Sequence, residues 1–222
     1  MSFARSLKEK SFDVWEACYR HPFVQELGQG VLNKEAFMFY LKQDYKYLLE
    51  YAKVFAIGVT KARGETVMKN LSLTQKAVLD EMDGHRAYMR RHGIDLAEAE
   101  ATRPSLFNKA YTANMISVGF QGELAELLMT VFPCAWTYYD FAVRLKQDYA
   151  DRLEANYYKN WIESYASVEY QASFEWFFDA VDDLCCHKSP AELERLTELF
   201  RNSVEFEYLF WDMSYKQLMS FA

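Results

Sequence analysis

Three side chains that can carry chemistry fall on the apolar faces of expected helices. The first is Cys134, which shares one face of the segment 122–147 with hydrophobic residues. Pro133 precedes it and removes one helical hydrogen bond, so we expect a kink that opens space beside the thiol. A thiolate is a strong nucleophile, but a lone inward cysteine is also a common small core residue. Both interpretations stay open at this point.

The second group is the carboxyl of Asp44, which interrupts the apolar stripe of the segment 33–62. Tyr40, Tyr47 and Tyr51 flank it on the same side of the helix. A buried carboxylate is costly unless it is hydrogen-bonded or paired. The neighbouring tyrosine hydroxyls therefore satisfy Asp44, or its carboxyl faces a polar ligand.

The third group is Glu207, which lies among the apolar residues of the segment 190–220, whereas Glu205 projects away and is expected to be solvated. Burial favours the neutral carboxyl, which suits a proton donor near neutral pH. The alternative is a structural glutamate paired with an arginine. One thiol and two carboxylates together indicate nucleophilic catalysis with proton transfer on a small flat molecule.

The elements that must position these groups are predicted to be helices. The chain of 222 residues contains only 8 Gly and 4 Pro, too few for a turn-rich β-fold. We expect an all-α, single-domain helical bundle over residues 1–222. Asn33 and the sequence Ser189-Pro190-Ala191-Glu192 are typical helix starts. Periodicity predicts helices over 3–20, 33–62, 65–92, 104–119, 122–147, 156–165, 167–187 and 190–220.

Composition narrows the classes of partner. A net charge of −7 and a pI near 5.2 disfavour binding to nucleic acid. The longest uncharged stretches, such as 127–139, are shorter than the ~20 residues that span a bilayer. The opening residues lack the apolar core of a signal peptide, so a cytoplasmic protein without a membrane partner is expected. The 4 Cys show no CxxC pair and are expected to be reduced.

Motifs for metal, nucleotide or serine chemistry are missing from the chain. It contains no HExxH, GxGxxG, GxxxxGK[ST] or GxSxG sequence. Glu81 and His85 lie four residues apart, and we expect a solvated pair in preference to a metal site. His21, which precedes Pro22, is expected to shape a turn. The four histidines are widely spaced: His21, His85, His92 and His187.

Six short blocks, in order along nearly the whole chain, resemble the TenA/thiaminase II family. Each block alone is a weak signal, but together they include all three inward polar groups. The blocks are His21-Pro22-Phe23-Val24, Gln43-Asp44 with Tyr47, Tyr111-Thr112 with Met115, Pro133-Cys134 with Trp136 and Tyr138-Tyr139, Trp161-Ile162 with Tyr165, and Glu207-Tyr208 with Phe210-Trp211.

This resemblance implies an all-α fold like that of haem oxygenase, without haem, in a homotetramer. The implied activity is that of an aminopyrimidine aminohydrolase, which converts 4-amino-5-aminomethyl-2-methylpyrimidine to the hydroxymethyl compound in thiamine salvage. The family can also cleave thiamine. The implied partner is therefore a small-molecule aminopyrimidine or thiamine, and neither a metal nor an organic cofactor is implied.

The resemblance also implies roles for individual residues. The nucleophile falls on Cys134, the proton donor on Glu207 and a substrate-binding carboxylate on Asp44. The remaining positions are tyrosines that contact the substrate, Tyr138 and Tyr165, and tyrosines that support the thiol, Tyr47 and Tyr111.

Two departures from the family pattern concern the width of the pocket. Lys46 and Ala135 stand where many relatives carry aromatic residues, and the stretch 166–168 lacks glycines often found there. These differences bear on substrate preference. Two rival interpretations stay open: a haem-oxygenase-like di-iron oxidase, which needs about six His and carboxylate ligands, and a helical regulator without catalysis.

Overall fold

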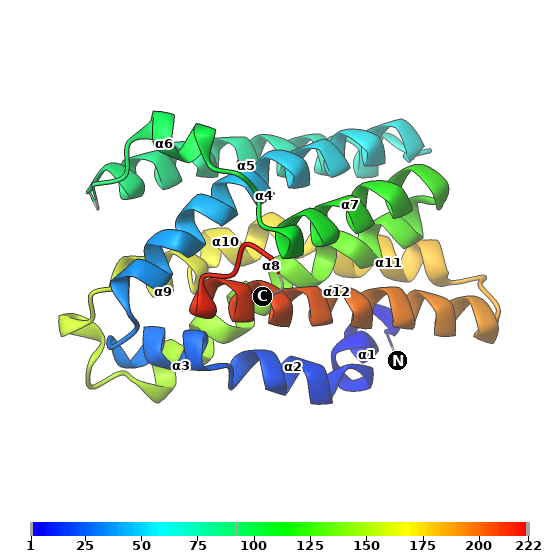
Figure 1. The fold of residues 1–222 in the computed structure, drawn as a ribbon. Helices are drawn as coiled ribbons and strands as arrows, with labels where there is room; N and C mark the ends of the chain where they lie inside the picture. The colour runs from blue at the N-terminus through cyan, green and yellow to red at the C-terminus, as the bar shows by residue number, and fades with distance from the viewer. Residues whose placement is uncertain (1, 92, 221–222) are drawn as a thin grey trace. The chain divides into compact units, whose positions relative to one another are not determined.

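The computed structural model describes residues 2–91 and 93–220, which form helices and contain no β-strand (Figure 1). The predicted all-α class is confirmed. Contacts group the chain into two compact units. The first comprises Met1–Leu32 and Leu128–Asp212, and the second comprises Asn33–Leu127 and Met213–Ala222. A single domain over 1–222 stays a prediction.

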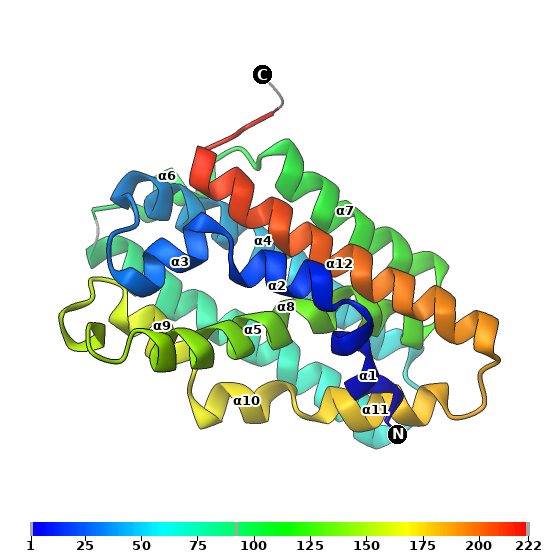
Figure 2. The ribbon, with the colours of Figure 1, turned by 90° about the horizontal axis from the view of Figure 1, so that it is seen from below.

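Among the described residues, the first unit contains nine helical elements, and two of them extend at one end into the second unit. In Figure 2, α1 lies beside α11, and the two helices are in contact. The elements are α1 (Phe3–Lys10), α2 (Phe12–Tyr19), α3 (Pro22–Gln29), α8 (Leu124–Asp148), the 3₁₀ turn η1 (Leu153–Ala155), α9 (Lys159–Tyr165), α10 (Val168–Phe174), α11 (Trp176–Cys185) and α12 (Pro190–Lys216).

Trp15 joins three helices in the core of the first unit. Its fully buried ring lies 5.2 Å from the ring of Trp136 on α8 and 6.4 Å from that of Phe200 on α12. The indole Nε1 donates a hydrogen bond of 2.8 Å to Asp140, also on α8. Burying the ring while satisfying its N–H fixes the rotation of α8 relative to α2.

A row of polar contacts also holds α2 against α8. Arg144 donates two hydrogen bonds to Glu16, of 2.5 and 3.1 Å, and its guanidinium lies 3.5 Å from the centre of the Tyr19 ring. The Tyr19 hydroxyl donates to Asp148 at 2.5 Å. A bidentate ion pair stacked on an aromatic ring resists sliding of one helix along the other.

The second unit contains α4 (Lys34–Lys61), α5 (Glu65–Arg91), α6 (Leu96–Ala101) and α7 (Leu106–Gln121), together with the first residues of α8 and the last of α12. Both α5 and α7 pack against α4 (Figure 1). Gln43 of α4 fixes the start of α7: its Oε1 accepts from Ser105 N at 2.8 Å, and its backbone carbonyl accepts from Asn108 Nδ2 at 2.8 Å.

Both predicted helix starts are confirmed. Asn33 Oδ1 accepts hydrogen bonds from the backbone N–H groups of Glu35 and Ala36, at 2.7 and 3.2 Å. The backbone N–H of Ser189 donates to the Glu192 carboxylate at 2.8 Å, so the capping box forms and α12 begins at Pro190. These local signals work because the caps satisfy helix N–H groups that have no partner inside the helix.

Several predicted boundaries were wrong. The helix 3–20 divides at Ser11, whose φ of −112° and ψ of 18° leave the helical region. The helix 167–187 divides at Glu175, where Phe178 N donates to Glu175 O, a hydrogen bond that spans three residues instead of the four of an α-helix. The last helix ends at Lys216, before residue 220, because Gln217 has a φ of +54°. His92, the end of the predicted helix 65–92, lies outside the described residues.

Three short elements were not predicted: α3, α6 and η1. Signals for α3 were present, because His21 Nδ1 accepts a hydrogen bond of 3.1 Å from Phe23 N and Pro22 occupies the first helical position. Gly30 ends the helix with a φ of +77°. His21, which was expected to shape a turn, is therefore the N-cap of this helix. None of the described helices is both long and apolar enough to cross a membrane.

Candidate active site

Cys134 lies inside α8, which continues through Pro133 without interruption. Its side chain is buried, and Cys134 is a free cysteine, as are Cys18, Cys185 and Cys186. The inward direction expected from the helical wheel is therefore confirmed. The contacts of α8 with α2 fix the rotation of the helix and thereby the direction in which the thiol points. A kink at Pro133 stays a prediction.

One turn beyond the thiol, Tyr138 enters a group of four rings that we call the aromatic cluster: Tyr138, Trp161, Tyr165 and Trp211. The ring of Tyr138 lies 4.9 Å from that of Tyr165 and 5.1 Å from that of Trp211. Trp161 lies 4.7 Å from Tyr165. The cluster joins α8, α9 and α12 and brings together the two tyrosines predicted to contact a substrate.

Glu207 lies on α12 of the first unit, one turn before Trp211 of the aromatic cluster. Glu207 is 2% exposed, whereas the Glu205 side chain is 52% exposed and pairs with Arg201 at 3.4 Å. The predicted contrast between the two glutamates is confirmed. The rings of Tyr138 and Trp211 show that α8 and α12 face each other where each carries one of the candidate catalytic groups.

A buried thiol that sequence reasoning did not assign, Cys18 of α2, lies within the electrostatic influence of Glu207. Burial raises the pKa of Cys18 well above the usual value, and the charge of Glu207 raises it further. The thiol donates a hydrogen bond of 3.3 Å to the carbonyl of Val204. Cys18 is therefore held as a neutral thiol and is a poor nucleophile.

In the second unit, Asp44 is buried and its main ionic contact is with a histidine. Asp44 Oδ2 lies 3.3 Å from His85 Nε2, and the same nitrogen lies 3.6 Å from Glu81 Oε1. Tyr40 adds a hydrogen bond to the Asp44 carboxyl. The prediction of a solvated Glu81–His85 pair was wrong, because His85 is only 8% exposed and packs between α4 and α5. Tyrosine hydroxyls, one of the two kinds of partner expected for Asp44, are thus only part of its surroundings.

Burial dominates the ionisation of Asp44. It raises the pKa of Asp44 to about 7; His85 acts in the opposite direction, and the charge of Glu81 adds to the rise. Burial lowers the pKa of His85, but the hydrogen bond to Glu81 and the charges of Asp44 and Glu81 outweigh burial, so this pKa is raised. Both groups therefore hold their protons more tightly than in water.

Tyr47 and Tyr111, predicted to support the nucleophile, contact each other within the second unit. Their ring centres lie 5.1 Å apart, which joins α4 to α7. The Tyr47 hydroxyl donates to the sulfur of Met115 at 3.7 Å, one turn beyond Tyr111. Both rings are buried. Their action on Cys134 stays a prediction.

A hollow of about 370 Å³ lies elsewhere in the first unit, between α2 and α12. Its lining includes Glu205 and does not include Cys134 or Glu207. We therefore assign it no part in the candidate chemistry. Within 2–91 and 93–220, no group of three or more His, Cys, Asp or Glu side chains is arranged to hold a metal ion.

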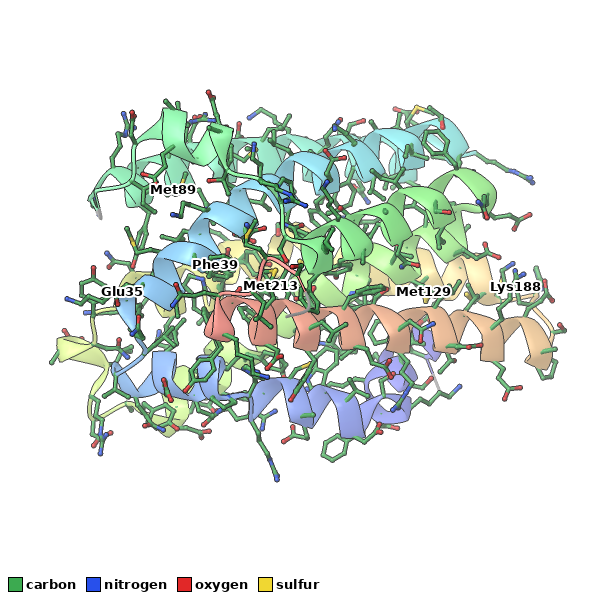
Figure 3. All side chains as sticks on the ribbon, viewed as in Figure 1. Glu35, Phe39, Met89, Met129, Lys188 and Met213 are labelled. Atoms are coloured by element: carbon green, nitrogen blue, oxygen red, sulfur yellow. The ribbon has the colours of Figure 1, made fainter. Side chains whose placement is uncertain are left out.

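The sequence contained a signal for His85 that periodicity reasoning missed. Val78, Met82 and Met89 are buried on α5, at spacings of three and four residues around His85. This places the imidazole on the apolar stripe, where a histidine needs a partner from the neighbouring helix. Figure 3 labels Met89, one turn beyond His85 on α5.

The chain is similar to known proteins over nearly its whole length. A profile of the TENA/THI-4/PQQC family matches residues 9–217. An aminopyrimidine aminohydrolase of Helicobacter pylori is 41% identical over 217 residues, which are 97% of this chain and 100% of that protein. The chain belongs to the TENA/THI-4/PQQC family, and the family resemblance expected from the six blocks is confirmed.

Solved structures of other proteins identify the fold. A TenA family transcription regulator from a Silicibacter species superposes with a TM-score of 0.89 at 31% identity, covering 96% of each chain. A domain from Shewanella denitrificans, described as having a haem-oxygenase-like fold, gives a TM-score of 0.77 at 13% identity and covers 96% of this chain and 92% of its own. The fold is haem-oxygenase-like, as expected.

Proposed function

We propose that this chain is an aminopyrimidine aminohydrolase that hydrolyses 4-amino-5-aminomethyl-2-methylpyrimidine to its hydroxymethyl counterpart in thiamine salvage. Cleavage of thiamine is a second activity of the same residues. The observation that carries the proposal is the 41% identity, over nearly the whole of both chains, with the Helicobacter pylori enzyme of that name. The family match over residues 9–217 supports one TenA-like domain over 1–222.

The roles of individual residues are part of this proposal. Cys134 is the nucleophile and Glu207 is the acid and base, supported by their burial on facing helices of the first unit. Asp44 binds the amino group of the pyrimidine, and the rings of Tyr138 and Tyr165 contact it. Tyr47 and Tyr111 support the thiol.

The reaction follows from the chemistry of an electron-poor ring. Glu207 protonates a ring nitrogen, which makes the ring electrophilic, and the Cys134 thiolate then adds to a ring carbon. The amine leaves the exocyclic methylene as ammonia, and water adds to the resulting alkene. Loss of the thiolate restores aromaticity and frees the hydroxymethyl product. With thiamine, the thiazole is the leaving group in place of ammonia.

The test is a substrate comparison with purified protein. We expect one ammonia and one hydroxymethylpyrimidine for each aminomethylpyrimidine consumed, measured by a coupled ammonia assay and by mass spectrometry. Thiamine, offered in a parallel reaction, should yield the same pyrimidine and free thiazole. Failure to turn over either compound, in a protein that binds both, would contradict the proposal.

A non-catalytic regulator is the second candidate, since one solved relative is called a transcription regulator. The net charge of −7 opposes direct binding to DNA. We also propose a cytoplasmic homotetramer, the assembly and compartment expected from the sequence and its resemblance. Fractionation of the cell that makes the protein tests the compartment, and its mass in solution tests the assembly.

A further inference from the structure

The contact between α4 and α5 buries three ionisable groups whose arrangement calls for a functional explanation. His85 Nε2 lies between Asp44 Oδ2, at 3.3 Å, and Glu81 Oε1, at 3.6 Å. The side chains of Asp44 and His85 are 5% and 9% exposed, whereas that of Glu81 is 32% exposed. A buried ion pair adds little net stability, because desolvation offsets the attraction between the charges. Stability alone therefore does not account for the pair.

The hydrogen bonds show which side-chain atoms of Asp44 and His85 already have partners. Among the described residues, buried His85 Nδ1 has no hydrogen-bond partner, whereas Nε2 faces the two carboxylates and carries a proton toward them. Asp44 Oδ2 forms an ionic contact with His85 but accepts no hydrogen bond from the described residues. Tyr40 supplies the hydrogen bond to the same carboxyl. Asp44 thus presents a buried, charge-balanced oxygen that can accept a hydrogen bond.

The charged groups that act on Asp44 come from α5. His85 favours its ionised form, and Glu81 opposes it. The other helices packed on α4 contribute Glu98 of α6, which pairs with Lys42 at 3.0 Å, and Tyr111 of α7, whose ring contacts Tyr47. Removing His85 therefore removes the group that opposes the effect of burial on Asp44.

We propose that His85 is a positioning residue for the substrate, which favours the ionised form of the Asp44 carboxyl and orients it so that Oδ2 accepts a hydrogen bond from the exocyclic amino group of the aminopyrimidine. This inference rests on the proposed function and specifies how the protein recognises an aminopyrimidine. A charged acceptor makes a hydrogen bond about twice as strong as a neutral one. In this role His85 acts on the ligand through Asp44.

The first test needs no ligand. Carbon NMR of protein labelled at aspartate carboxyls follows the ionisation of Asp44, assigned with Asp44→Asn. We expect the midpoint in the wild-type protein near pH 7 and a rise of at least ~1 pH unit in His85→Gln, because the cation is lost. Reciprocally, Asp44→Asn should lower the pKa of His85 seen in its ring-proton signals, and this reading stands even if His85→Gln does not fold.

The second test measures binding of 4-amino-5-hydroxymethyl-2-methylpyrimidine by calorimetry at pH 7 and pH 9. With the ionised carboxyl as the binding form, His85→Gln should bind at least ~5-fold more weakly than wild type at pH 7 and within ~3-fold of wild type at pH 9, since Kd scales inversely with the competent fraction. His187→Gln, a change at an exposed histidine, is the matched control and should behave like wild type at both pH values.

The outcomes separate the two proposals. Unchanged Asp44 ionisation in His85→Gln, or a loss of affinity that is equal at pH 7 and pH 9, would overturn the positioning role of His85. A wild-type protein that neither binds nor turns over the aminopyrimidine would contradict the proposed function instead. In that case the NMR titrations would still decide whether His85 controls Asp44.

Discussion

The reactivity of the cysteines differs with their surroundings. Cys134 is buried one turn before Tyr138 on α8, Cys18 is kept neutral by burial and by Glu207, and Cys186 is exposed. Exposure alone would therefore select Cys186 for modification. Reaction with a substrate selects differently, because it requires a thiol close to groups that bind and protonate the ring.

We expect Cys134→Ser to lower kcat/KM for the aminomethylpyrimidine by at least ~10²-fold with little change in folding, since the exchange is nearly isosteric and an alcohol is a much weaker nucleophile. Steady-state kinetics and circular dichroism measure the two effects. Cys186→Ser is the control and should keep the wild-type rate. If Cys186→Ser abolished activity while Cys134→Ser did not, the nucleophile would be misassigned.

The two glutamates of α12 provide a matched pair. Glu207→Gln keeps the shape of a buried side chain but cannot donate a proton, so kcat should fall by ~10² to 10⁴ and the pH dependence of kcat/KM should flatten. Glu205→Gln changes an exposed side chain and should alter stability and rate little. The assignment is falsified if Glu205→Gln is the damaging change.

At the scale of elements, the contact between α4 and α5 makes the stability of the second unit depend on pH. The pKa of Asp44 is about 7 in the folded protein, compared with 3.8 for a free side chain, so the folded state binds this proton more tightly. The resulting stabilisation is complete below about pH 4 and is lost as pH rises through 7. The pKa of His85 is also raised, from 6.5, so the stabilisation that His85 contributes is likewise lost as pH rises above 6.5.

Asp44→Asn should therefore weaken the fall in the free energy of unfolding between pH 5 and pH 8, by about 2 to 3 kcal/mol relative to wild type. Urea denaturation at several pH values measures this difference. Asp95→Asn, at an exposed aspartate of the same unit, is the control and should reproduce the wild-type slope. A wild-type slope in Asp44→Asn would show that Asp44 is not the titrating group.

For the whole molecule, assembly is the property to measure. We expect sedimentation equilibrium to give four times the 26.2 kDa mass of the chain. Several large apolar side chains are exposed, including Phe120 of α7, which is 69% exposed, and Val168 of α10, which is 76% exposed. Burial in an interface between subunits would remove them from water. A monomer at micromolar concentration would contradict the tetramer.

Local chemistry in the chain was enough to predict much of this architecture. The low Gly and Pro content and the 3.6-residue periodicity identified an all-α protein, and the caps at Asn33 and Ser189 were read correctly. The same periodicity placed Asp44, Cys134 and Glu207 inward, because a regular helix converts spacing along the sequence into direction in space. The motif blocks then identified the family.

Contacts between helices had to be seen in the tertiary structure. Spacing along one helix indicates which face is apolar but not which helix covers it, so Glu81 and His85 looked like a solvated pair until α4 covered that face of α5. For the same reason the neutral state of Cys18 depends on Glu207, a residue far away in the sequence. Ionisation depends on burial and on neighbouring charges, and both arise only when distant segments pack together.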